Sequence, residues 1–399
     1  MRAEDGSGVT GRQLAIGLLL VAVAVGVAVP ILRVEPVARE RATELPRMTE
    51  PTAGADVGQY TVPVVYDVDF AGAGRGYALW GRCTDGADYR CERRLLVTED
   101  GVRWAERPFG VPELAAPEKL VGRVVALGGD RLVLTDLADG GRHDRYYSGD
   151  AGRSWRVAST TPDLRVSRIP ADAVLETRCL ERMPPESDCS WRRVVVSLPD
   201  SGERAWLVDL PPLDAPTPSR RPAPDGSWWV SGRDRATGAL SVASSRDGGA
   251  SWSVVPLPVV PGTVADQVSV TAAGSAVYAL ATGRRPDGWE PRSLIAIYQS
   301  TDGGRSWTQT WWANGNPPRT LGGDAVVLPD GALFVAPDDV GPAYRSVDGG
   351  RNFEPVQDGP RFHSVRRTWG GYLAVTTGGS GGGFLTSPDG VRWADVRFG

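Results

Sequence analysis

S-T-D-G-G-R-S-W, residues 300–307, decides the fold, because the pattern S-x-D-x-G-x-x-W recurs along the chain. Close copies lie at residues 148–155, 245–252 and 346–353, and copies shorter by one residue lie at 98–104 and 387–393. Ser and Asp side chains hydrogen-bond nearby backbone groups, and glycine supplies the positive φ of a tight hairpin turn. The closing Trp or Phe begins the next strand and buries a ring of roughly 150–250 Å². We therefore expect the aspartates of the pattern to hold turns: Asp100, Asp150, Asp247, Asp302, Asp348 and Asp389.

The spacing of these aspartates predicts the architecture. Successive members lie 50, 97, 55, 46 and 41 residues apart, and the double gap holds a degenerate copy, D-S-G-E-R-A-W, at residues 200–206. Seven units of this length suit seven blades of four short strands. The sequence predicts an all-β, seven-bladed β-propeller over residues 58–399, with blades starting near residues 60, 118, 164, 218, 266, 319 and 361.

The repeated pattern resembles the Asp-box, and the chain resembles the Asp-box (BNR) β-propellers, which include sialidases, sortilin-type ectodomains and photosystem assembly-factor-like proteins. The resemblance implies that each box joins the third and fourth strands of a blade, away from the central channel. It implies little about function, because this fold carries many unrelated activities.

The composition and charge of the chain give no support for nucleic-acid binding or for a histidine-based catalytic or metal site. The chain has 50 Gly and 32 Pro in 399 residues, which is rich in turns, and its net charge of −4 gives no argument for binding nucleic acid. Its only histidines, His143 and His363, lie far apart in the sequence and form no catalytic or metal-binding pattern. We predict no metal site and no cofactor, and we expect a monomer.

An apolar segment lies near the N-terminus. Residues 14–32, LAIGLLLVAVAVGVAVPIL, carry no charge over about the 20 residues that span a bilayer as a helix. We predict a transmembrane signal-anchor there, preceded by a short cytoplasmic segment, 1–13, and followed by a linker, 33–57. A signal peptide cleaved after Gly26-Val27-Ala28 is the alternative.

Four cysteines indicate the compartment. Cys83 and Cys91 bracket one loop, and Cys179 and Cys189 bracket a loop at the equivalent place two units later. We expect two local disulfides, which form in oxidising compartments. Metal binding is the alternative, although neither pair has the spacing of metal ligands. The cysteines thus predict a single-pass protein of the cell membrane with its propeller on the extracytoplasmic side.

The likeness to sialidases directs attention to a Phe/Tyr-Arg-Ile-Pro motif, whose arginine grips the carboxylate of sialic acid in that family. The nearest match is Ser-Arg-Ile-Pro at 167–170, which lacks the aromatic residue and follows two boxes instead of preceding all of them. A Tyr–Glu nucleophile pair and an acid/base aspartate match no motif here. We therefore assign no catalytic residue.

The first strand of each blade is expected to line the central channel. Arginines on those strands would suit bidentate capture of a carboxylate or phosphate; the alternative is that they pair with nearby aspartates or face the neighbouring sheets. Alternation along a strand predicts that at most one of residues 220 and 221, and one of 366 and 367, faces the channel. The candidate ligand-binding residues are Arg123, Arg168, Arg221, Arg367, Asp67 and Asp324.

Two functions from different classes follow. The first is a membrane-tethered, extracytoplasmic propeller that acts as a non-catalytic binding or scaffold module for a protein, glycan or cell-wall ligand. The second is a sialidase-like glycoside hydrolase with its active site in the channel. The sequence favours the first.

Overall fold

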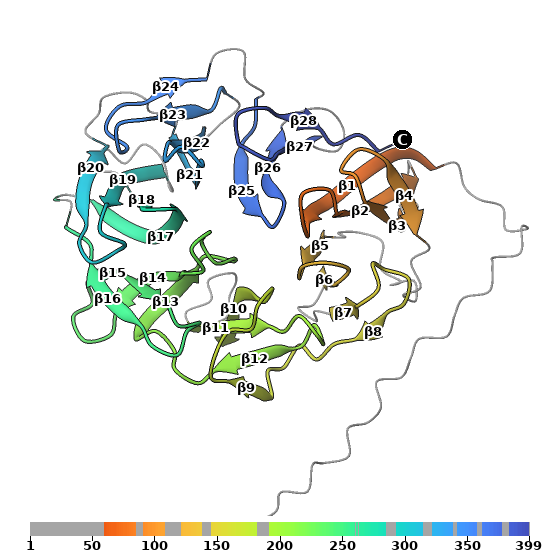
Figure 1. Cartoon of the computed structure of the whole chain (residues 1–399), viewed down its shortest axis with the longest axis horizontal. Coiled ribbons are helices and arrows are strands. Elements are labelled where there is room, and N and C mark those ends of the chain that lie inside the picture. The colour runs from red at the N-terminus through yellow and green to blue at the C-terminus, as the bar shows by residue number, and fades with distance from the viewer. Residues whose placement is uncertain are drawn as a thin grey trace, which may run out of the picture. The chain divides into compact units, whose positions relative to one another are not determined.

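The computed structural model describes residues 60–398 apart from 85–90, 108–120, 138–144, 182–190, 260, 262, 285–292, 314–320, 338–340, 357–360 and 377–382. In the described residues every regular element is a strand, and 28 strands form seven four-stranded sheets. The sheets follow one another around a ring, which makes the fold a seven-bladed β-propeller (Figure 1). We number the blades 1 to 7 in chain order.

The strands are short, and each blade uses one continuous stretch of the chain. Blades 1 to 3 contain β1 (Tyr60–Phe70), β2 (Gly76–Thr84), β3 (Cys91–Thr98), β4 (Trp104–Arg107); β5 (Val121–Ala126), β6 (Leu132–Leu137), β7 (Arg145–Ser148), β8 (Arg156–Val157); β9 (Leu164–Val166), β10 (Val174–Glu181), β11 (Trp191–Ser197) and β12 (Arg204–Leu207). Blades 4 and 5 contain β13 (Leu213–Pro218), β14 (Trp228–Asp234), β15 (Leu240–Ser245), β16 (Ser253–Pro256); β17 (Val264–Ala273), β18 (Ala276–Arg284), β19 (Ser293–Ser300) and β20 (Thr308–Trp312). Blades 6 and 7 contain β21 (Leu321–Val327), β22 (Leu333–Pro337), β23 (Tyr344–Ser346), β24 (Glu354–Pro355); β25 (Ser364–Thr368), β26 (Gly371–Thr376), β27 (Gly383–Ser387) and β28 (Ala394–Asp395).

Six blades are simple antiparallel meanders, and blade 3 is not. Its strand order is β10-β11-β12-β9, with β9 parallel to β12 at the outer edge. The prediction that blade 3 begins with a channel-lining strand near residue 164 is therefore wrong. Its innermost strand is β10, and the backbone N–H of Leu175 donates to the carbonyl of Arg220 in blade 4 at 3.0 Å.

The repeated sequence forms the same turn in six blades, between the third and fourth strands. In blade 5 the hydroxyl of Ser300 donates to Asp302 at 2.7 Å and accepts the N–H of Gly304 at 2.8 Å. Asp302 also accepts the N–H of Ser306 at 3.0 Å. The degenerate copy in blade 3 instead joins β11 and β12, the second and third strands of that sheet.

The aromatic residue that ends each turn packs against the preceding blade. Trp307 of blade 5 meets Trp229 of blade 4 edge-on, with ring centroids 6.4 Å apart. Blade 1 follows the same rule against blade 7: Trp104 lies 5.0 Å from Phe398 and shares a core with Leu373 and Phe384. The ring thus closes by packing between blades 7 and 1, with each sheet complete in itself.

Several predictions fall on residues that the structure does not describe. These are the cytoplasmic segment 1–13, the anchor 14–32, the linker 33–57, and Cys189. No helix in the described part of the chain is long and apolar enough to cross a membrane. Cys83 and Cys91 are register partners on β2 and β3.

Candidate functional site

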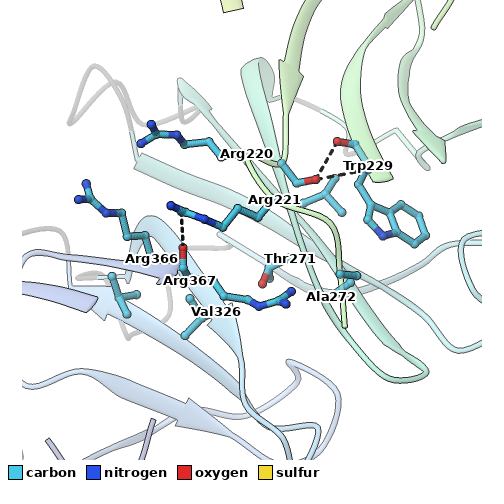
Figure 2. A pocket seen from close by; sticks show the side chains of 13 residues that line it. Arg220, Arg221, Trp229, Thr271, Ala272, Val326, Arg366 and Arg367 are labelled. Carbon is cyan, nitrogen blue, oxygen red and sulfur yellow. Dashed lines mark hydrogen bonds between the residues drawn. The ribbon is translucent and has the colours of Figure 1, made fainter. Parts of the chain in front are cut away.

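A cavity of about 160 Å³ opens where blades 4, 5, 6 and 7 meet (Figure 2). Its wall combines apolar side chains from the inner strands with four arginines from two short segments. Arg220 and Arg221 follow β13, and Arg366 and Arg367 lie on β25. All four line the same cavity, and Arg220 and Arg221 extend to the same side of it, so the prediction that only one of that pair faces the centre is wrong; Arg366 and Arg367 extend to opposite sides, as alternation along β25 predicts (Figure 2). Residues 220 and 221 lie in a turn beyond the strand, where strict alternation does not hold.

Arg221 connects blade 4 with blades 1 and 7. Its guanidinium is ion-paired with Asp69, and the two side chains are 4% and 1% exposed. Its Nη1 donates to the carbonyl of Arg367 at 3.1 Å, and its guanidinium carbon lies 5.5 Å from the ring centroid of Trp369. Burial would raise the pKa of Asp69, but Arg221 and Arg366 outweigh it and hold that pKa below the ordinary value. The Arg221 side chain therefore joins blades on different sides of the propeller through buried contacts at its centre.

Arg366 forms a second pair across the junction of blades 7 and 1. Its Nη2 donates to Asp67 Oδ1 at 2.8 Å and also to the carbonyl of Val68. The other carboxylate oxygen of Asp67 accepts the N–H of Val124 in blade 2 at 3.1 Å. Two residues later, Asp69 Oδ2, the oxygen that pairs with Arg221, accepts the N–H of Ala126 at 2.9 Å. Both aspartates are thus fully engaged in joining blades.

The other two arginines of the cavity have no carboxylate partner among the described residues. Arg367 makes one hydrogen bond, from Nη1 to the carbonyl of Pro222 at 2.9 Å, and burial lowers its pKa. Arg220 is half-buried with no ion pair in the described part of the chain. In Figure 2, Arg220, Arg221 and Arg366 extend to one side, whereas Arg367 extends to the other, beside Thr271 and Ala272. The cavity therefore holds an excess of positive charge.

The structure separates the remaining predicted channel residues from this cavity. Arg123 lies on β5, the innermost strand of blade 2, and is exposed. Arg168 is exposed, because it follows β9, which pairs with β12 at the outer edge of blade 3. Asp324 lies on β21 and keeps contact with solvent, although desolvation raises its pKa against the opposing effects of His363 and Arg366.

Sequence reasoning did not assign four residues of this region. Asp69 shares a face of β1 with Asp67 because they are two residues apart, and this spacing was the available signal. Arg220 and Arg366 were set aside by the alternation argument. Thr271 carries no motif at all. Trp228 and Trp229 are both buried, whereas Trp312 on β20 is 43% exposed.

A second buried charge cluster lies between blades 2 and 3. Glu176 accepts Arg145 Nη1 at 3.2 Å and Arg204 Nε at 3.0 Å, and the side chain of Arg145 has no exposure. No group of three or more His, Cys, Asp or Glu residues in the described chain is placed to hold a metal ion.

Comparison with known proteins adds little beyond the fold. No family model matches the chain, and no curated protein matches it. It is similar to YCF48 from Cyanidioschyzon merolae at 14% identity and a TM-score of 0.45, over 80% of this chain and 94% of that one. It is similar to the BP39L lectin from Burkholderia pseudomallei at 14% identity and a TM-score of 0.42, over 84% and 96%. It is also similar to the β-propeller domain of the Trilobed protease from Pyrococcus furiosus, at 12% identity and a TM-score of 0.47, over 85% of this chain and 97% of that one. Likeness at this level carries no argument about ligands or activity.

Proposed function

We propose that this chain is a membrane-tethered, extracytoplasmic β-propeller that binds a protein, glycan or cell-wall ligand and catalyses no reaction. The observation that carries the proposal is that Asp67 and Asp69, the carboxylates beside the cavity, are both paired with arginines from other blades. Glycoside hydrolysis needs a carboxylic acid that donates its proton to the leaving group. A carboxylate held ionised by an arginine is a poor donor of that kind.

The same region supports a binding role. Four arginines gather on one cavity, and two of them, Arg220 and Arg367, keep no carboxylate partner among the described residues. Arginine presents a planar fork of donors that suits carboxylates and phosphates. A ligand with an anionic group would therefore bind at this cavity, where blades 4, 5, 6 and 7 meet.

A glycoside hydrolase is the second candidate, and Asp324 is the observation that favours it. This aspartate is exposed on the inner strand of blade 6, and desolvation raises its pKa, as a general acid requires. His363 and Arg366 act on it from blade 7.

Turnover separates the two candidates. The full-length chain would be incubated with a panel of fluorogenic glycosides that includes sialosides, in parallel with Asp324→Asn and the exposed Arg168→Ala. We expect no fluorophore release from any of the three. Release by the wild-type chain that Asp324→Asn abolishes would overturn the binding proposal and assign the acid.

The extracytoplasmic location rests on residues 14–32 and on the cysteine pairs. We expect all four cysteines of the denatured chain to resist maleimide until a reductant is added, because two disulfides hold them. Labelling without a reductant would contradict that location.

A further inference from the structure

The cavity is mostly apolar apart from its arginines. Val270 and Ala272 come from β17, Ala325 and Val326 from β21, and Val365 from β25. Such a wall favours a ligand that brings apolar surface along with its polar group, since burying apolar area is favourable and burying unpaired polar atoms is not. A fully polar anion would leave this wall without a matching partner.

The charges on the wall indicate how much negative charge the ligand carries. Arg221 and Arg366 are already neutralised by Asp69 and Asp67. Arg367 is the one guanidinium that extends beside Thr271 and Ala272, and no carboxylate of the described chain pairs with it (Figure 2). Asp225 acts on Arg367 without forming an ion pair with it, so this desolvated cation lacks a direct counter-ion, which is costly, and one bound negative charge compensates it. The side of the cavity beside Thr271, which Arg220 does not reach, is therefore matched to a monoanion (Figure 2).

Thr271 supplies a second polar group beside Arg367. Its Oγ1 accepts the N–H of Val327 at 3.1 Å, and its own hydroxyl proton has no acceptor among the described residues. That proton is therefore available to a bound oxyanion. Together, the fork of Arg367 from blade 7 and the hydroxyl of Thr271 from blade 5 present two donors to the cavity.

We propose that this cavity binds a monocarboxylate on a short apolar stem, with the carboxylate on Arg367 and Thr271 and the stem against Val270, Val326 and Val365. The inference rests on the proposed binding function and specifies its ligand chemistry. The ligand is either a free small carboxylic acid or the carboxylate of a larger molecule whose end enters the cavity. A carboxylate from either source makes the same contacts with Arg367 and Thr271.

Calorimetric titration of the full-length chain in detergent micelles tests this proposal. The probes are acetate, propionate, butyrate, butyramide and inorganic phosphate. We expect affinity to rise about fourfold with each added methylene from acetate to butyrate, because each one buries further apolar surface. Butyramide, which matches butyrate in shape but lacks charge, is expected to bind at least tenfold more weakly.

Variants assign the contacts. Arg367→Ala is expected to weaken butyrate binding by about tenfold to a hundredfold, since it removes a charge-assisted hydrogen bond. Arg367→Lys keeps the charge but loses the fork, so we expect intermediate binding even if the alanine variant does not fold. Thr271→Val is expected to weaken binding by severalfold. Arg123→Ala removes an exposed arginine outside the cavity and is the matched control, with unchanged affinity.

Three results would overturn the inference: no butyrate binding by folded wild-type chain, tighter binding of phosphate than of butyrate, or equal butyrate binding by wild type and Arg367→Lys. A dansyl peptide ending in Val, compared with its C-terminal amide, then distinguishes the two sources: carboxylate-dependent binding assigns a chain end, and its absence assigns the free acid. Failure here leaves the non-catalytic function intact, because that function fails only if a glycoside is turned over.

Discussion

Asp67 and Asp69 show how two side chains organise the centre of the ring. They lie two residues apart on β1, so both point to the same face and both accept backbone N–H groups of β5, from Val124 and Ala126. The other oxygen of Asp67, Oδ1, accepts Arg366, whereas Arg221 pairs with the same Asp69 oxygen, Oδ2, that accepts the N–H of Ala126. A buried carboxylate is stable only when its lone pairs are satisfied in this way. The two aspartates therefore tie blades 1, 2, 4 and 7 together.

Glu176 plays a similar role between blades 2 and 3. Burial would raise its pKa, but the guanidinium groups of Arg145 and Arg204 outweigh that effect and lower the pKa to about 2. A carboxyl whose folded pKa lies below its unfolded value adds stability above the unfolded pKa and loses it on acidification. Glu176 thus stabilises the fold fully above its ordinary pKa of 4.5, and this contribution disappears as the pH falls toward 2.

Substituting Glu176→Gln tests this assignment. Between pH 4.5 and about 2 we expect the free energy of unfolding to fall less steeply with acidification than in wild type, by up to about 1.4 kcal/mol per pH unit. Urea unfolding at several pH values measures the slope. Glu354→Gln, which changes an exposed carboxylate on β24, is the control and should leave the slope unchanged. A Glu176→Gln slope identical to that of wild type would contradict the assignment.

At the scale of the element, the four full-length copies of the repeated turn each contain two successive residues with positive φ, whereas the two shorter copies contain one. In blade 5 these are Gly303 and Gly304, with φ of 72° and 86°. In blade 2 the first position is Ala151, at φ 60°, which an L-residue adopts only at a cost. The second position also lies against the preceding blade, since a Cβ on Gly304 would lie 2.6 Å from the ring of Trp229.

Two glycine substitutions separate strain from crowding. Gly238→Ala, at φ 70° with nothing within 4 Å of the added methyl group, is expected to lower the free energy of unfolding by about 1–2 kcal/mol. Gly304→Ala adds a clash with a buried ring and is expected to cost about 1–3 kcal/mol more. Urea denaturation of both variants measures the difference. Equal losses would mean that the turn does not press on blade 4.

The repeat made most of the fold predictable, and blade 3 marks where prediction failed. Seven blades and the positions of six turns follow from the spacing of one motif. The segment around Leu164 has the alternating apolar residues of any short strand, and its own residues do not say which edge of the sheet it joins. Contacts with the next blade decide the edge, because the backbone carbonyl of Arg220 in blade 4 accepts the N–H of Leu175 and so places β10 at the inner edge. Because the position of that strand was predicted wrongly, the predicted position of Arg168 in the channel was wrong as well.

The candidate site was predictable in part for a related reason. Arg221, Arg367 and Asp67 were identified from their expected place on inner strands; Arg221 donates to the carbonyl of Arg367, and Asp67 pairs with the neighbouring Arg366. Alternation separated Arg220 from Arg221 on the assumption that the strand continues through them, whereas β13 ends at Pro218. A side chain such as Thr271, which acquires its role from a neighbouring blade, has no signal in the local sequence.

At the scale of the whole molecule, the ring is held at its rim and at its centre. Around the rim, the aromatic residue of each turn packs against the preceding blade. Between blades 7 and 1 this contact is made by Trp104 and Phe398. At the centre, Arg221 reaches from blade 4 to Asp69 in blade 1, with 151 residues between them in the sequence. A ring whose centre is closed by such a pair presents a rigid surface, which suits a binding module.

A double-mutant cycle on Asp69 and Arg221 tests this account most directly. The free energy of unfolding would be measured for wild type, Asp69→Asn, Arg221→Met and the double variant. We expect each single substitution to cost about 3–5 kcal/mol, because it leaves a buried polar or charged partner behind. We expect the double variant to cost less than their sum, with a coupling of at least about 1.5 kcal/mol. Coupling of zero, with both single variants near wild-type stability, would contradict a propeller closed at its centre and would favour an open channel.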